Sequence, residues 1–182
     1  MPSSDAPNTE PRGESGPYGF RPVTAGDLAL LRGWLQAPHF AEWWGQPDGV
    51  CEFEAAIACP ATEPMIVELD GRPIAYLQCY DPHLEDGHPY RDQPRGTLGF
   101  DLSIGPAGLV GRGHGSAMLR QAVETRFASG MRRAVIDPNP GNSRAIAAYR
   151  KAGFRTLERR STTYGEVLLM AQDAPKQDGI NE

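Results

Sequence analysis

The chain has 182 residues, of which 40% are hydrophobic, and this is enough for one domain with a substantial core. No apolar run is long enough to predict a membrane-spanning helix. The formal net charge of −5 argues against nucleic acid as a partner, because phosphate contacts need a basic surface, but it is compatible with a cationic substrate.

Both ends of the chain are polar and rich in turn-forming residues. The opening MPSSDAPNTEPRGESGP has neither a basic n-region nor an apolar h-region, so it does not predict a signal peptide. We expect a disordered extension over residues 1–17, one folded domain over 18–173 and a disordered tail over 174–182.

Cysteine and histidine usage gives no sign of a metal site. The cysteines Cys51, Cys59 and Cys79 are odd in number and lack metal-ligand spacing, which favours free thiols in a reducing cytoplasm. His83 and His88 fall in a polar segment without a cysteine partner, so we interpret that segment as a solvated loop.

The first elements are a strand and a capped helix. YGFRPV predicts a strand, and the TAGD that follows is a capping box with Thr24 as N-cap and Asp27 three residues later. The helix after it carries Leu28, Leu31 and Leu35 on one face.

The next segment, PHFAEWWGQP, does not fit a simple helix face, because Trp43 and Trp44 are adjacent and flanked by Gly and Pro. CEFEAAIA predicts a short helix, and MIVELDGRPIAYLQCY predicts a hairpin turning at Asp70-Gly71. DPHLEDGHPYRDQPRG is a long loop without periodicity, of a kind that is often functional, and GTLGFDLSIG returns as a strand.

Three glycines stand at the start of the following helix. In VGRGHGS, Gly111, Gly113 and Gly115 leave a row of backbone N–H groups free of side chains, and the helix runs on to a plausible left-handed cap at Gly130. Such a row at a helix N-terminus attracts phosphate.

A strand and a second helix complete this unit. MRRAVID predicts a buried strand ending at Asp137, and the turn PNPGN leads into NSRAIAAYRKAGF. There Asn142 is the expected N-cap, Ile146 and Tyr149 share a face, and Gly153 closes the helix.

Two nucleotide-binding alternatives can be weighed against this pattern. A Walker loop is excluded, because no Gly-Lys-Ser/Thr follows at the required spacing. A dinucleotide-binding fold would use Gly111, Gly113 and Asp137 and would predict a nicotinamide cofactor. Against it stand the long PAGLV connection before the glycines and the short remaining chain.

The runs VGRGHGSAML and DPNPGNSRAIAAYRKAGF resemble the coenzyme A loop and the fourth helix of the Gcn5-related N-acetyltransferases (GNAT), with NxxAxxxYxKxGF as the most diagnostic piece. The resemblance extends from Phe20 to Gln172. It implies a mixed α/β fold: a twisted, mostly antiparallel sheet whose fourth and fifth strands are parallel and splayed, flanked by about four helices. One departure is Val110, where the family commonly has Arg or Gln; Arg112 and His114 are the nearest substitutes.

Within this family the chain is most similar to the aminoglycoside 6'-N-acetyltransferases, through PHFAEWWG, RPIAYLQCY and an Asp-Gly pair well before GFD. The resemblance implies acceptor-binding residues that form an aromatic wall and a set of carboxylates: Trp44, Tyr80, Asp86, Asp101 and Asp137. The chain departs from these enzymes at HPYRD, where they place adjacent Trp residues and more acids, and Arg91 and Arg95 reduce the negative charge.

The resemblance also implies acetyl-CoA as cosubstrate, without a metal. The residues expected at this cosubstrate are Leu102, Ser103, Ile104, Val110, Gly111, Arg112, Gly113, His114, Gly115, Ser116, Asn142, Ala145 and Tyr149.

The chemistry can be argued separately. An ammonium with a pKa of about 10 is only about one part in a thousand free amine at neutral pH, which opposes attack by about 4 kcal/mol. We expect Asp101 to take the proton, directly or through water, and Tyr149 to donate to the departing thiolate. Backbone N–H groups over residues 102–104 are expected to stabilise the thioester oxygen.

The sequence and the resemblance therefore predict a cytoplasmic acetyl-CoA-dependent N-acetyltransferase that acts on a polycationic small molecule, at the 6'-amine of an aminoglycoside, and hence antibiotic resistance. We expect a monomer or homodimer with no nucleic acid or membrane partner. The alternatives are a siderophore-type lysine or hydroxylysine N-acyltransferase and a coenzyme A-binding sensor without turnover.

Overall fold

The computed structural model describes residues 16–44, 50–163 and 165–176, so the predictions for 1–15 and 177–182 lie outside the described residues. Its strands are β1 (Tyr18–Pro22), β2 (Thr62–Leu69), β3 (Arg72–Tyr80), β4 (Thr97–Ile104), β5 (Arg133–Ile136), β6 (Arg155–Thr162) and β7 (Gly165–Asp173). Its α-helices are α1 (Leu28–Leu35), α2 (Pro38–Trp44), α3 (Val50–Ala58), α4 (His114–Ala128) and α5 (Ser143–Ala152).

All the strands join one sheet in the order β1-β2-β3-β4-β5-β7-β6. Neighbouring strands are antiparallel except β4 and β5, which are parallel. The predicted mixed sheet with its parallel central pair is confirmed. Five α-helices flank it within the described residues, where about four were expected, and none of them is long and apolar enough to cross a membrane.

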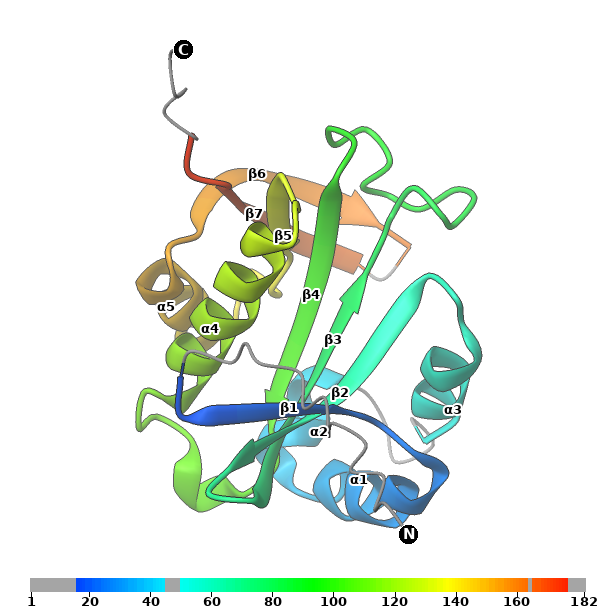
Figure 1. Ribbon diagram of the computed structural model, residues 1–182, viewed down its shortest axis with the longest axis vertical. Coiled ribbons are helices and arrows are strands. Elements are labelled where there is room, and N and C mark those ends of the chain that lie inside the picture. Colours follow the sequence, from blue (N-terminus) through cyan, green and yellow to red (C-terminus); the bar gives the residue numbers. More distant parts are fainter. Residues whose placement is uncertain (1–15, 45–49, 164, 177–182) are drawn as a thin grey trace, which may run out of the picture.

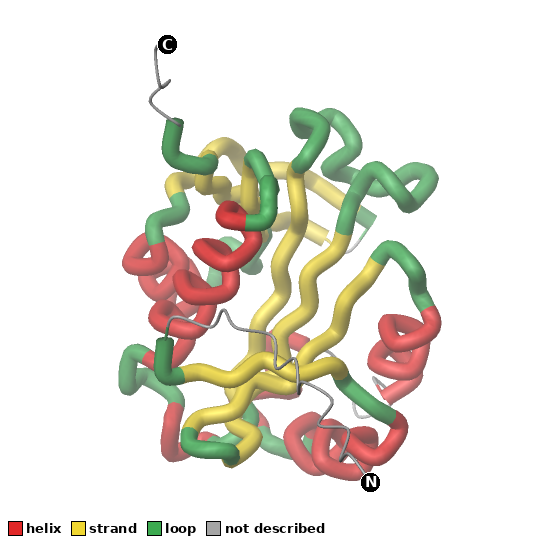
Figure 2. The backbone as a smooth tube through the Cα atoms, viewed as in Figure 1, coloured by secondary structure: helices red, strands yellow, loops and turns green. Residues whose placement is uncertain are grey.

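The helices cover opposite faces of the sheet (Figures 1 and 2). Because side chains alternate along a strand, the neighbours Tyr76 and Leu77 of β3 point to different faces. Tyr76 packs in a cluster with Leu31, Phe40 and Phe53 of α1, α2 and α3, whereas Leu77 belongs to the larger core built with α4 and α5.

The turns predicted from sequence are present. Asp70 (φ 51°) and Gly71 (φ 71°) both adopt positive φ at the β2–β3 hairpin, as a two-residue turn of this type needs. The capping box at the start of the first helical segment is confirmed: the Thr24 backbone N–H donates to Asp27 Oδ2 at 2.9 Å. Asp27 also accepts bidentate hydrogen bonds from Arg21 at 2.8 and 2.9 Å, which joins this cap to β1.

The prediction for PHFAEWW was wrong, because the segment forms α2. Pro38 occupies the first helical position, where its missing N–H costs nothing. Successive helix positions are about 100° apart, so the adjacent tryptophans face different surroundings. Trp44 stacks on Phe53 with ring centroids 5.8 Å apart, while Trp43 is 42% exposed.

The loop between β3 and β4 is ordered by its own side chains, which corrects the prediction of a merely solvated segment. The His83 side chain is buried. Its backbone N–H donates to Asp81 Oδ1 at 2.8 Å, and its Nε2 donates to the Gln93 carbonyl at 3.0 Å. The ring of His88 lies between those of Tyr80 and Tyr90, with centroids 5.2 and 5.3 Å away.

The parallel pair separates soon after it forms. β4 and β5 pair from Thr97–Arg133 to Gly99–Val135, and no pairing follows beyond that point among the described residues. Asp101 of β4 and Asp137, the residue after β5, each come two positions after the last paired residues. The divergence exposes one edge of β4 and opens the sheet at the position of these two acids.

Candidate active site

A cavity of about 390 Å³ occupies this opening. It is lined by α2, the last residues of β4, the glycine-rich segment before α4, the residues after β5, and α5. Among its lining residues are Asp101, Leu102, Ser103, Ile104, Val110, Gly111, Gly113, Gly115, Ser116, Asp137, Asn142, Ala145, Tyr149 and Trp44.

The glycine-rich segment bends so that it exposes backbone at the start of α4. Gly111 (φ 79°) and Gly113 (φ 91°) adopt left-handed conformations, and Gly113 is the N-cap of the helix. A Cβ built on either residue would meet no atom within 4 Å, so the space beside both is open. Backbone N–H groups at a helix N-terminus suit a phosphate group, so Gly111 and Gly113, here called the cradle, have the geometry of an anion site.

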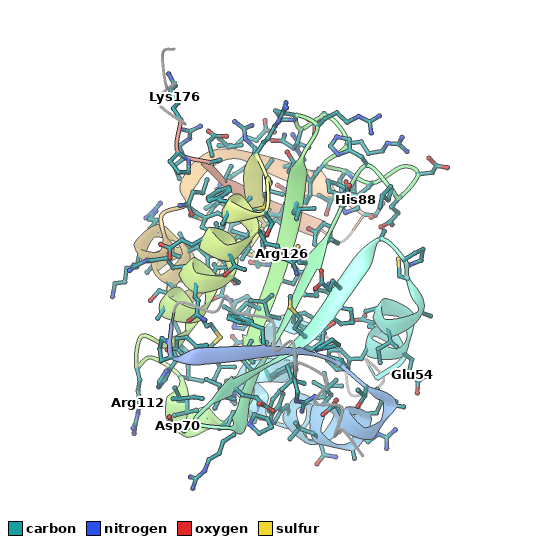
Figure 3. All side chains as sticks on the ribbon, viewed as in Figure 1. Glu54, Asp70, His88, Arg112, Arg126 and Lys176 are labelled. Carbon is teal, nitrogen blue, oxygen red and sulfur yellow. The ribbon has the colours of Figure 1, made fainter. Side chains whose placement is uncertain are left out.

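Arg112 and His114, the residues on either side of Gly113, do not line the cavity. Figure 3 shows the Arg112 side chain pointing away from the body of the protein, and the residue does not line the cavity. His114 Nδ1 hydrogen-bonds with the Tyr18 hydroxyl of β1 at 3.0 Å, and this residue also lies outside the lining. Val110 lines the cavity next to Gly111, and neither Arg112 nor His114 substitutes for the side-chain contact that an Arg or Gln at position 110 could make.

Asp101 is held by a chain of hydrogen bonds on β3. Its Oδ2 accepts from Gln78 Nε2 at 2.7 Å, and Gln78 Oε1 accepts from the Tyr76 hydroxyl at 2.6 Å. Burial raises the pKa of Asp101 to about 6, against a smaller lowering by the Gln78 hydrogen bond. The carboxyl group is therefore fixed in orientation and titrates close to neutral pH.

Asp137 is held from the opposite side by the β3–β4 loop. Its Oδ2 accepts a hydrogen bond of 2.5 Å from the Tyr90 hydroxyl. Burial first, and then the charge of Asp101, raise the pKa of Asp137 to about 7. Because the two acids interact, their protons are lost in steps that belong to the pair and not to either residue alone.

Tyr149 lies on the face of α5 that lines the cavity. The helix begins at Asn142, whose Oδ1 accepts from the Ala145 N–H at 3.0 Å, as predicted for this N-cap. Tyr149 is 8% exposed. Burial, together with the nearby Asp101 and Asp137, raises its pKa, so the phenol keeps its proton and can act as a donor.

Two residues expected at the acceptor do not reach the cavity. Tyr80 covers Gly99, where an added Cβ would fall 2.1 Å from the tyrosine ring, so this glycine is needed for the close approach. Asp86 is fully exposed and pairs with Arg91 at 2.5 Å. Both lie outside the residues that line the cavity.

Other lining residues were missed by the sequence analysis: His39, Trp43, Ile136, Pro138, Asn139, Arg144, Ala147, Ala148 and Lys151. His39 of α2 donates from Nε2 to the carbonyl oxygens of Ile104 and Gly105, at 3.0 and 3.1 Å, and so joins α2 to the end of β4. The sequence gives no signal for this contact, since it depends on how α2 packs. On α5, Arg144, Ala147 and Lys151 lie on a different face of the helix from Tyr149, so the pattern around Tyr149 did not indicate them.

Over residues 16–44, 50–163 and 165–176, no three His, Cys, Asp or Glu side chains come together in a way that could hold a metal ion.

The chain is similar to known proteins in both its sequence and its fold. Residues 23–162 match a family model described as an acetyltransferase (GNAT) domain. The chain is 33% identical over 163 residues to an aminoglycoside N(6')-acetyltransferase type 1 of Klebsiella pneumoniae, covering 84% of this chain and 81% of that protein. It is 29% identical over 184 residues to the lysine N-acyltransferase MbtK of Mycolicibacterium paratuberculosis, covering 98% and 81%.

Similar solved structures include the aminoglycoside acetyltransferase AAC(6')-Ib. Its complex with ribostamycin and coenzyme A superposes with a TM-score of 0.78 at 31% identity, over 90% of this chain and 100% of that one. Its complex with coenzyme A and kanamycin gives a TM-score of 0.76 at 33% identity, over 86% and 94%.

Proposed function

Because the chain belongs to the GNAT acetyltransferase family, we propose that it transfers the acetyl group of acetyl-CoA to a primary amine of an aminoglycoside, at the 6' position. The observation that carries this proposal is that Asp101 and Asp137, each held by a hydrogen bond, line one cavity together with Tyr149. The relatives named for aminoglycosides supply the acceptor class.

The donor side of the cavity fits acetyl-CoA. The N–H groups around Gly111 and Gly113 would hold the pyrophosphate, and the open edge of β4 over residues 102–104 would lie along the pantetheine arm. When bound, acetyl-CoA supplies an acetyl group activated as a thioester.

The carboxylates serve the acceptor. An ammonium ion is drawn to Asp101 and Asp137, but it has to lose a proton before its nitrogen can attack the thioester carbon. A carboxylate pair with pKa values of about 6 and 7 is a better proton acceptor than a carboxylate with the ordinary value of 3.8. Asp101, oriented by Gln78, takes the proton directly or through a water.

Two kinds of group on the protein stabilise the negative charge that develops on acetyl-CoA during the transfer. As the nitrogen–carbon bond forms, backbone N–H groups on the open edge of β4 can donate to the carbonyl oxygen. As the carbon–sulfur bond breaks, the Tyr149 hydroxyl can give its proton to the sulfur, which leaves as a thiol. The Tyr149 phenolate then regains a proton from water, and Asp101 releases to water the proton that it took from the amine. The raised pKa of Tyr149 means that the phenol is protonated throughout the neutral range before transfer.

A lysine-type acceptor is the second candidate. It is favoured by the likeness to MbtK and by the placement of Asp86, which pairs with Arg91 outside the cavity. Without Asp86, the carboxylates among the described lining residues are Asp101 and Asp137. Two carboxylates match the charge of one ammonium group better than the several positive charges of a polyamine.

The test is acetyl-CoA-dependent thiol release by the purified protein with kanamycin, tobramycin, amikacin, lysine and hydroxylysine. We expect turnover with the aminoglycosides that is lost in Asp101→Asn. Turnover confined to lysine and hydroxylysine would replace the acceptor class, and binding of coenzyme A without turnover of any amine would refute an enzymatic role.

A further inference from the structure

Tyr90 connects the β3–β4 loop to the cavity. The residue is only 1% exposed, and its hydroxyl donates to Asp137 Oδ2 at 2.5 Å. A buried tyrosine hydroxyl needs a hydrogen-bond partner. Here that partner is a carboxylate of the candidate active site, 47 residues further along the chain.

The ring of Tyr90 is fixed by its neighbours. The guanidinium carbon of Arg160, on β6, lies 5.5 Å from the ring centroid. Arg160 also donates to the Pro89 carbonyl at 2.5 Å and to Asp92 Oδ2 at 2.8 Å, so it fastens the loop on both sides of Tyr90. His88 meets the ring edge-on, and the rest of its surroundings is a small apolar cluster of Val135, Leu169 and Ala171.

We propose that Tyr90 is a positioning residue for the transfer reaction: it holds the Asp137 carboxylate toward the cavity and favours its ionised form, so that Asp101 and Asp137 receive the acceptor ammonium together. This inference rests on the proposed function. Donation to an ionised carboxylate stabilises the charge, whereas a protonated carboxyl gains less from the same donor.

The titratable groups that face Asp137 come from each element around it. They are Asp101 of β4, Tyr149 of α5, Tyr80 of β3 and Tyr90 itself. Asp101 disfavours a second negative charge, and Tyr90 is the group that donates a hydrogen bond to Asp137. Losing this one hydroxyl would therefore favour the protonated form of Asp137.

The pH dependence of kcat/KM for the acceptor tests this role. In Tyr90→Phe, the ring and its packing stay, but the donor is lost. The limb along which activity falls on acidification should move upward by about one pH unit. Tyr18→Phe is the matched control, since its hydroxyl contacts His114 and not the acid pair, and its acidic limb should stay at the wild-type position. An acidic limb in Tyr90→Phe that coincides with the wild type would overturn the proposal.

A second readout does not need turnover. Carboxyl carbon NMR of the free protein, assigned with Asp137→Asn, should show the titration of Asp137 at higher pH in Tyr90→Phe than in the wild type. In the wild type, the ring carbon that bears the Tyr90 hydroxyl should follow the same titration. If no amine is acetylated but these shifts are found, the proposed function fails while the role of Tyr90 in holding Asp137 stands. If both NMR signals are insensitive, the positioning role is wrong whatever the activity.

Discussion

Replacing Asp137 by Asn should stabilise the protein at alkaline pH. The amide keeps an oxygen that can accept from Tyr90, but it removes the charge. The pKa of Asp137 is raised from 3.8 to about 7, mainly by burial, so the folded state resists ionisation that the unfolded chain undergoes freely. Between these two values the folded state binds more protons than the unfolded state. The wild type therefore loses stability as pH rises through this window, and the loss is complete above about pH 7.

The interval between the two pKa values corresponds to about 4 kcal/mol. The actual cost in folding free energy is smaller, because the Asp137 carboxyl faces a water-accessible cavity and because its titration depends on the charge of Asp101. We therefore expect Asp137→Asn to gain roughly 1–2 kcal/mol in free energy of unfolding at pH 8, and clearly less at pH 5.

Urea denaturation at the two pH values measures this difference. Asp86→Asn is the matched control, because Asp86 is fully exposed and its replacement should leave the stability essentially unchanged at both pH values. If Asp137→Asn is destabilised at pH 8, or if its gain is the same at both pH values, the burial argument for the acid pair is refuted.

The remaining predictions concern the cradle, the proton donor and the cap. Gly113→Ala should cost about 1–2 kcal/mol, since φ is 91° there, whereas Gly115→Ala, inside α4, should be neutral or stabilising; thermal denaturation compares the two. Tyr149→Phe should lower kcat by roughly a hundredfold, while calorimetry finds coenzyme A affinity nearly unchanged. Asp27 accepts from Arg21, which lowers its pKa to about 2. Asp27→Asn should thus destabilise by about 1–2 kcal/mol at pH 7, and denaturation curves should converge as pH falls from about 4 to 2.

Local sequence signals predicted most of the fold. The Asp70-Gly71 turn, the TAGD cap and the Asn142 cap each depend on residues within a few positions of one another, and each is present. The helix at PHFAEWW was missed because its adjacent tryptophans break the pattern of one apolar face. In the structure, Trp44 packs into the protein while Trp43 remains partly exposed.

The site was less predictable where it depends on contacts between distant segments. The resemblance pointed to Asp101 and Asp137, and both line the cavity that opens where β4 and β5 separate. It gave no indication of the Tyr90–Asp137 hydrogen bond, because the loop that carries Tyr90 has no periodicity of its own. Asp86 was assigned by motif position, and its pairing with Arg91 appears only in three dimensions.

In the proposed reaction, Asp101 and Asp137 deliver a primary amine of an aminoglycoside to acetyl-CoA. The most direct measurement is the product formed from kanamycin, acetyl-CoA and the purified protein, identified by mass spectrometry and by NMR assignment of the modified nitrogen. We predict a single acetyl group on the 6'-amine, absent when Asp101→Asn replaces the wild type. Unmodified kanamycin, in a preparation that acetylates lysine or hydroxylysine under the same conditions, would contradict the claim.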